Sequence, residues 1–181
     1  MTYFILMLTI SRIFFAILIF ILILFFQNYF LSFLFFLIAA VTDYLDGSLA
    51  RKYNAESRLG EILDPISDKV LLLSLLFSLS LATSDLFLAS ISCLILTREF
   101  IVSSLRESSA LKDNNNLLKV TNIAKIKTAT QFVAISTYLF SLTFDYALIF
   151  FIAHFIFFIA ALFTFLSLTK YLEIFVKEGL R

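Results

Sequence analysis

The chain has 181 residues, of which 61% are hydrophobic and 15% are charged, and its mean hydropathy is +1.01. Since soluble domains are far more polar, we predict an all-α integral membrane protein with a single membrane domain over residues 1–181. The formal net charge of +1 gives no sign of a nucleic-acid partner. The single cysteine, Cys93, excludes an intramolecular disulfide and a Cys-x-x-Cys metal site, and we expect it to be a small buried hydrophobic residue.

Six apolar segments follow one another, each long enough to cross about 30 Å of hydrocarbon at about 1.5 Å per helical residue. We predict six transmembrane helices at 3–26, 29–50, 62–83, 86–106, 121–143 and 146–169. The first carries one charge, Arg12, about two turns inside. The third contains Pro65, which removes a backbone hydrogen bond and should bend that helix.

The basic residues are unevenly distributed over the connections between these segments. The breaks near 27–28, 83–85 and 144–146 contain no Lys or Arg. All fourteen basic residues lie in the ends and connections of the opposite side, or in the turns that lead to it. Because cytoplasmic loops are enriched in Lys and Arg, we predict that both termini and the polar connection at 107–120 are cytoplasmic.

One stretch interrupts the apolar pattern with four aspartates, two of the three glycines and the only proline. Asp43 and Asp46 are three residues apart, and Asp64 and Asp68 are four apart, so each pair lies on one face of its own helix. Charged residues inside membrane helices are costly and usually functional. We expect the two faces to bring four carboxylates into one pocket at the cytoplasmic boundary of the membrane.

The residue types in this stretch indicate a metal-dependent phosphate site. Four carboxylates in a low-dielectric pocket need compensating positive charge, and oxygen ligands without nearby His or Cys favour Mg²⁺ or Mn²⁺ over zinc. Two such ions would clamp a diphosphate. Gly47 and Gly60 leave room for a nucleotide, and Arg51 can reach a phosphate. In the alternative reading, the carboxylates only form interfacial salt bridges with Arg51, Lys52, Arg58 and Lys69.

Eight positions form the pattern D-x2-D-G-x2-A-R-x8-G-x3-D-x3-D: Asp43, Asp46, Gly47, Ala50, Arg51, Gly60, Asp64 and Asp68. This pattern resembles the signature of the CDP-alcohol phosphotransferases without a departure at any position. The resemblance implies a six-helix membrane enzyme, usually a homodimer, that displaces CMP from a CDP-linked lipid or alcohol. It implies that Asp43, Asp46 and Asp64 chiefly hold the metals, and that Asp68 is the general base and a further metal ligand. The first seven of the eight residues would contact the CDP-linked substrate.

Segments outside the signature are similar to those of bacterial phosphatidylglycerophosphate synthases: LTISR, LDPISDK, TREFIVSSLRE and AKIKTATQ. This similarity implies transfer of the phosphatidyl group of CDP-diacylglycerol to sn-glycerol 3-phosphate. It also implies a multi-pass protein of the bacterial inner membrane whose active site faces the cytoplasm. Tyr3 and Ile5 replace the usual Asn-x-Pro of that family, and Ala124 replaces a glycine.

An anionic acceptor needs cations on the cytoplasmic side, where the sequence offers Arg98, Arg106, Lys125 and Lys127. Arg98 lies two turns deep, which disfavours simple snorkelling to the interface. For Arg106 and Lys125, contact with lipid headgroups is the alternative. Glu99 either pairs with Arg98 or shapes the acceptor pocket.

Other functions remain open at this point. The acceptor could be an inositol phosphate, or phosphatidylglycerol in a cardiolipin-forming enzyme. A divalent-cation transporter could use the aspartates as its binding site, but transporters carry polar residues through the midplane of several helices. Here the halves of the segments away from the aspartates are almost purely apolar, which argues against transport. The intact signature disfavours a degenerate, inactive relative.

Overall fold

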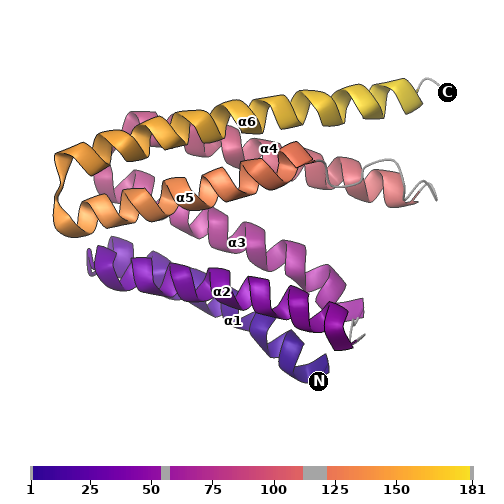
Figure 1. The fold of residues 1–181 in the computed structure, drawn as a ribbon, viewed down its shortest axis with the longest axis horizontal. Coiled ribbons are helices and arrows are strands. Elements are labelled where there is room, and N and C mark those ends of the chain that lie inside the picture. The colour runs from indigo at the N-terminus through magenta and orange to yellow at the C-terminus, as the bar shows by residue number, and fades with distance from the viewer. Residues whose placement is uncertain (1, 54–57, 112–121, 180–181) are drawn as a thin grey trace. The chain divides into compact units, whose positions relative to one another are not determined.

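The computed structural model describes residues 2–53, 58–111 and 122–179. This part of the chain contains six α-helices and no strand, which confirms the predicted all-α class (Figure 1). The helices are α1 (Thr2–Leu24), α2 (Tyr29–Tyr53), α3 (Arg58–Thr83), α4 (Leu86–Leu111), α5 (Asn122–Phe144) and α6 (Ala147–Gly179). Each predicted segment overlaps one of them.

Several of these helices have the length and composition of membrane-embedded helices. Within the described ranges, four stretches are long and apolar enough to cross a membrane: Leu6–Leu24, Ile62–Thr83, Leu86–Glu107 and Ala147–Val176. Helix α2 adds a shorter apolar stretch, Tyr29–Asp43. Large apolar side chains are exposed in rows, such as Phe14, Ile17 and Ile21 on α1. Because soluble proteins rarely expose such rows, the chain is a membrane protein. Its six-span topology stays a prediction.

The three breaks without basic residues are tight turns between consecutive helices. Each contains one residue with a left-handed backbone, namely Gln27 (φ 49°), Ser84 (φ 51°) and Asp145 (φ 54°). A left-handed residue commonly ends a helix because it reverses the chain direction. At the first break, the Asn28 side chain accepts a hydrogen bond from Leu31 N at 3.0 Å and thereby caps α2.

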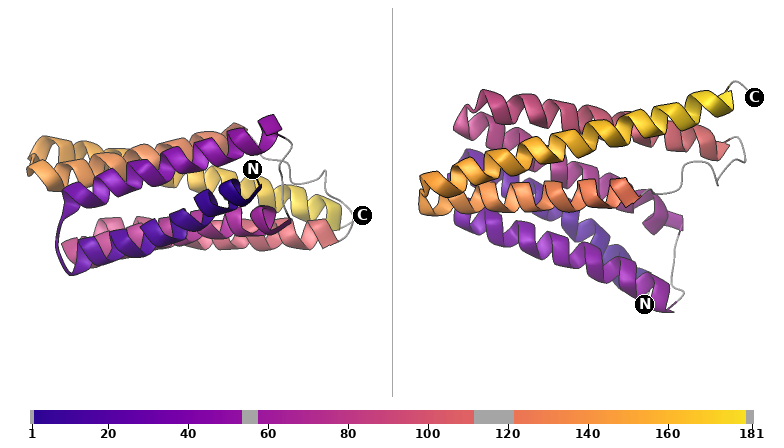
Figure 2. Two further views of the ribbon diagram at one scale, coloured as in Figure 1. Left: turned by 90° about the horizontal axis from the view of Figure 1, so that it is seen from below. Right: turned by 45° about the horizontal axis from the view of Figure 1, so that its top comes forward.

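The chain forms two compact units, and the first comprises Met1–Asp85 and Leu139–Tyr146. In it, α1 packs against both α2 and α3, and Figure 2 shows α1 running alongside α3. The buried residues of α1 recur at helical spacing and form one stripe: Thr9, Arg12, Ala16, Ile19 and Ile23. Helix α3 contributes Leu71, Leu75 and Leu79 to the same core. The charged residue Arg12 therefore lies within the buried stripe of α1.

The second unit comprises Leu86–Tyr138 and Ala147–Arg181. Helix α4 packs against α6, and the buried pair Val102 and Tyr171 lies in this contact. Helix α6 continues to Gly179, well beyond the predicted end at 169. The sequence after Lys170 is only amphipathic, but Tyr171 and Ile174 give it an apolar face that packs on α4. Helix α6 therefore extends beyond the uniformly apolar part of the last predicted segment.

Two local predictions fall on described residues. Helix α3 continues through Pro65, and the bend expected there stays a prediction. The expected burial of Cys93 is wrong, because Cys93 is exposed. The buried stripe of α4 contains Ile91, Ile95 and Val102, and Cys93 lies off it on another face of the helix. The single membrane domain predicted from the sequence stays a prediction.

Candidate active site

An acidic cluster in the first unit is formed by Asp43 of α2 with Asp64 and Asp68 of α3. One carboxylate oxygen from each residue lies within 4.8 Å of the others. About half of each side chain is exposed. The structure therefore brings together three of the four predicted aspartates, and the surface of the cluster is open to a small ligand.

The partner of all three carboxylates is Arg12 of α1, whose side chain is 0% exposed. Its Nη1 donates to Asp43 Oδ1 at 2.6 Å and also to Asp68 Oδ1, while its Nη2 donates to Asp64 Oδ1. The cluster thus contains three carboxyl groups and one guanidinium. The cluster can therefore still attract further positive charge.

Helical spacing explains why these four side chains meet. On α2, the buried Ser32, Phe36 and Ala39 are followed at the next position of the same face by Asp43. On α3, Asp64 and Asp68 precede buried Leu71 and Leu75 in the same way. Each acidic residue is the polar continuation of a core stripe. Packing of the apolar parts of these stripes against one another therefore brings the charged side chains together.

Arg12 was noted in the sequence only as a charge inside the first segment, and its role as partner of the aspartates was missed. The signal was available, since Arg12 occupies the stripe of Thr9, Ala16 and Ile19 and therefore faces neighbouring helices. The salt-bridge alternative named other cations. The side chains of Arg51, Lys52 and Arg58 lie outside the described part of the structure.

Several predicted site residues cannot be placed by their side chains. Asp46, Gly47, Ala50 and Arg51 belong to the helical backbone of α2, but their surroundings lie outside the described residues, as do those of Lys125. Gly60 is described and lies in the first turn of α3, four residues before Asp64. A residue one helical turn before Asp64 lies on the same face, as the signature requires.

The acidic cluster fits a divalent cation of the hard type. Its donors are carboxylate oxygens from two helices, the ligand type that Mg²⁺ and Mn²⁺ prefer. The oxygens are close enough to share an ion, and the exposed half of each side chain leaves a route to them. The side chain of Arg12, in contrast, is fully buried. Both the type of the carboxylate ligands and their accessibility therefore fit a divalent cation.

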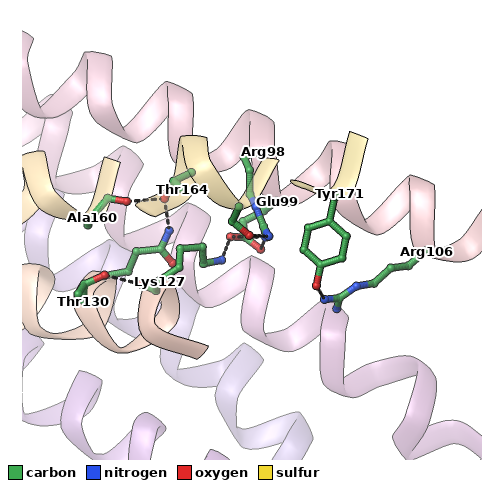
Figure 3. Close-up of polar contacts among 10 residues, drawn as sticks. Arg98, Glu99, Arg106, Lys127, Thr130, Ala160, Thr164 and Tyr171 are labelled. Carbon is green, nitrogen blue, oxygen red and sulfur yellow. Dashed lines mark hydrogen bonds and ion pairs between the residues drawn. The ribbon is translucent and has the colours of Figure 1, made fainter. Parts of the chain in front are cut away.

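A basic cluster in the second unit is formed by Arg98 and Lys127 with Glu99 between them (Figure 3). Lys127 Nζ donates to Glu99 Oε1, and Arg98 Nη1 lies 3.4 Å from Glu99 Oε2. Arg98 Nη2 also donates to Ser167 Oγ at 2.6 Å. Both cationic residues are only 4% exposed. Glu99 therefore pairs with Lys127 in addition to Arg98, and pairing with Arg98 is the first of the two roles considered for it.

Arg106 joins this region through Tyr171, a buried residue of α6 that the sequence did not single out. Arg106 Nη2 donates to Tyr171 Oη at 2.5 Å, as Figure 3 shows. The guanidinium carbons of Arg106 and Arg98 lie 5.1 and 5.4 Å from the centre of the Tyr171 ring. Cations at this distance over an aromatic face are attracted to it. Tyr171 was missed because it follows the predicted end of the last segment, although its spacing from Ser167 continues the buried stripe of α6.

Comparison with known proteins identifies relatives of this chain. The family model described as CDP-alcohol phosphatidyltransferase matches residues 6–166. A curated relative from Blochmanniella floridana, named CDP-diacylglycerol–glycerol-3-phosphate 3-phosphatidyltransferase, is 43% identical over 83 residues, which are 46% of this chain and 44% of the relative. Proteins of the same name from Rickettsia bellii and Haemophilus influenzae are 49% and 40% identical over 79 and 78 residues. Both matches cover 43% of this chain and 42% of the relative.

The matched region spans less than half the length of these curated relatives. The family model, in contrast, covers most of the chain, including every described residue of the acidic and basic clusters except Ser167 and Tyr171. The chain belongs to the CDP-alcohol phosphatidyltransferase family.

Proposed function

We propose that the protein transfers the phosphatidyl group of CDP-diacylglycerol to sn-glycerol 3-phosphate, giving phosphatidylglycerophosphate and CMP. The observation that carries this proposal is the convergence of Asp43, Asp64 and Asp68, three residues of the eight-position signature, on one small volume. Family membership and the names of the curated relatives support the same reaction.

In this proposal, Asp43, Asp64 and Asp68 hold Mg²⁺ or Mn²⁺, together with Asp46, in a site for two ions. When bound, the ions would neutralise the diphosphate and stabilise the departing CMP. The small residues Gly47, Ala50 and Gly60 would leave room for the nucleotide. Arg51 would bind a phosphate through its planar fork of donors.

The residues of the chain favour direct attack by the acceptor. The hydroxyl oxygen of the acceptor would bond to the phosphorus that carries diacylglycerol, the bond from that phosphorus to the CMP oxygen would break, and Asp68 would take the hydroxyl proton. Ser67, the hydroxyl residue beside Asp68, is fully buried and donates to the backbone oxygen of Asp64 at 2.9 Å. It is therefore unsuited to act as a covalent nucleophile.

The basic cluster supports an anionic acceptor. Arg98, Arg106 and Lys127 carry three positive charges against the one negative charge of Glu99, so these four side chains leave two positive charges. A phosphate monoester dianion such as glycerol 3-phosphate has the complementary charge. Lys125 would add a further cation. Phosphatidylglycerol as acceptor would bring a phosphodiester with one negative charge and fits this surplus less well.

The same proposal includes the arrangement in the membrane. Six spans, cytoplasmic termini and a cytoplasmic active site follow from the distribution of basic residues. The protein would act as a homodimer in the bacterial inner membrane, as the family resemblance implies. The acidic cluster lies toward one end of the apolar stretches Tyr29–Asp43 and Ile62–Thr83, which argues for an enzyme over a transporter, since a transporter would carry polar residues through the midplane.

The test offers the purified protein labelled CDP-diacylglycerol with each of three acceptors: glycerol 3-phosphate, inositol phosphate and phosphatidylglycerol. We expect CMP release with glycerol 3-phosphate, its loss in EDTA, and its return with Mg²⁺ or Mn²⁺. Faster release with another acceptor would reassign the substrate, and full activity in the chelator would rule out the metal site.

A further inference from the structure

Arg12 of α1 bonds to carboxylates from both neighbouring helices of the first unit. A buried guanidinium is unfavourable without partners, and three close carboxylates are unfavourable without a cation. Each group therefore removes the instability of the other. The contact also joins α1 to α2 and α3 near the end of their common core.

The direction from which Arg12 approaches is informative. Its side chain is entirely buried, whereas about half of the surface of Asp43, Asp64 and Asp68 is exposed. Arg12 contacts the oxygen Oδ1 of each of these three carboxylates. The guanidinium thus holds the carboxylates from the protein interior, while a cation from solvent would meet their exposed side.

We propose that Arg12 is a positioning residue that sets the three carboxylates in the arrangement a divalent cation requires before the cation arrives. Its planar fork reaches three oxygens at once, which an ammonium group on a flexible stem does not do as well. Neighbours that orient metal ligands commonly contribute a factor of about 10 to 100 to metal affinity. The inference rests on the proposed function only in taking a divalent cation as the ligand of the cluster.

If Arg12 instead occupied the place of the cation, its removal would change the affinity for a divalent cation in the opposite direction. If Arg12 merely filled the cation's place, its removal would delete a competing positive charge and the affinity for a divalent cation would rise. If Arg12 positions the carboxylates, its removal lets them repel each other and move apart, and the affinity falls. The direction of the change therefore separates the two roles.

The experiment measures Mn²⁺ affinity of the purified full chain in detergent micelles, without substrate, from the electron paramagnetic resonance signal of free Mn²⁺. We expect Arg12→Met to weaken Mn²⁺ binding at least about tenfold, which is about 1.4 kcal/mol. Arg12→Lys keeps the charge and should recover part of the affinity. Thr9→Val changes the same buried stripe one turn earlier without loss of charge and should bind Mn²⁺ as the wild type does.

Circular dichroism at 222 nm reports whether each variant keeps its helices. If Arg12→Met unfolds, Arg12→Lys carries the test, since it should fold and bind Mn²⁺ several-fold more weakly than the wild type. Wild-type affinity or tighter binding in a folded Arg12 variant would overturn the inference and leave the proposed function intact. Absence of Mn²⁺ binding by the wild type would instead overturn the metal site itself, and the inference with it.

Discussion

Replacement of Glu99 by glutamine tests the charge balance of the basic cluster. Glu99 lies between Lys127 and Arg98, both nearly fully buried, and is the carboxylate that pairs with each of them in the described structure. Glu99→Gln keeps the size of the side chain and an oxygen that can accept the Lys127 hydrogen bond. It removes the negative charge and leaves two buried cations facing each other.

The size of the effect follows from the burial of the partners. Loss of one partner of a buried ion pair typically destabilises a protein by about 3–5 kcal/mol. Because glutamine preserves a hydrogen bond and Glu99 is partly accessible, we expect the lower end, about 3 kcal/mol. For a chain of this length each kcal/mol shifts Tm by about 2–4 °C, so Tm should fall by roughly 6–12 °C.

Thermal unfolding should be followed by circular dichroism at 222 nm in detergent, since the chain is helical and has no Trp for fluorescence. The matched control is Glu107→Gln, an exposed glutamate on the same helix, which should change Tm by a degree or two at most. Glycerol 3-phosphate should raise Tm more in Glu99→Gln than in the wild type, because the dianion replaces the lost negative charge. Equal Tm values for the two variants, or a larger effect of glycerol 3-phosphate on the wild type, would refute the reasoning.

Three further outcomes are expected. Asp68→Asn should lower kcat about 10²–10⁴-fold with little change in KM for glycerol 3-phosphate, since it removes the proposed base; an unchanged kcat would exclude that role. Arg98→Gln should raise KM for glycerol 3-phosphate about ten- to a hundredfold, as expected for loss of a charge-assisted hydrogen bond of about 1.5–3 kcal/mol. A selective rise in KM for CDP-diacylglycerol would move Arg98 to the diphosphate site. In a Cys93→Ser background, cysteine at Ser84 should react with a membrane-impermeant reagent from outside intact cells, and cysteine at Glu107 should not; the reverse labelling would invert the proposed topology.

The sequence was sufficient for features that depend on local periodicity. Apolar runs of membrane length indicated six helices, and the spacing of Asp64 and Asp68 placed both on one helical face, where they share Arg12 as a partner. Where apolarity alone marked the end of an element, the prediction was less accurate. Helix α6 continues past 169 because the face containing Tyr171 packs on α4, and that contact lies outside any local window of sequence.

By itself, the sequence determined the fold class, the membrane environment and the family, and it predicted a metal-ligating role for the aspartates, because each depends on composition or on residue types at fixed spacing. The partners of the charged side chains, in contrast, depend on the tertiary structure. Arg12 meets Asp43, Asp64 and Asp68 across 31, 52 and 56 residues, and Arg106 meets Tyr171 across 65. A charge on a buried stripe must find a counter-charge, but only the packing of one helix on another selects which residue supplies it.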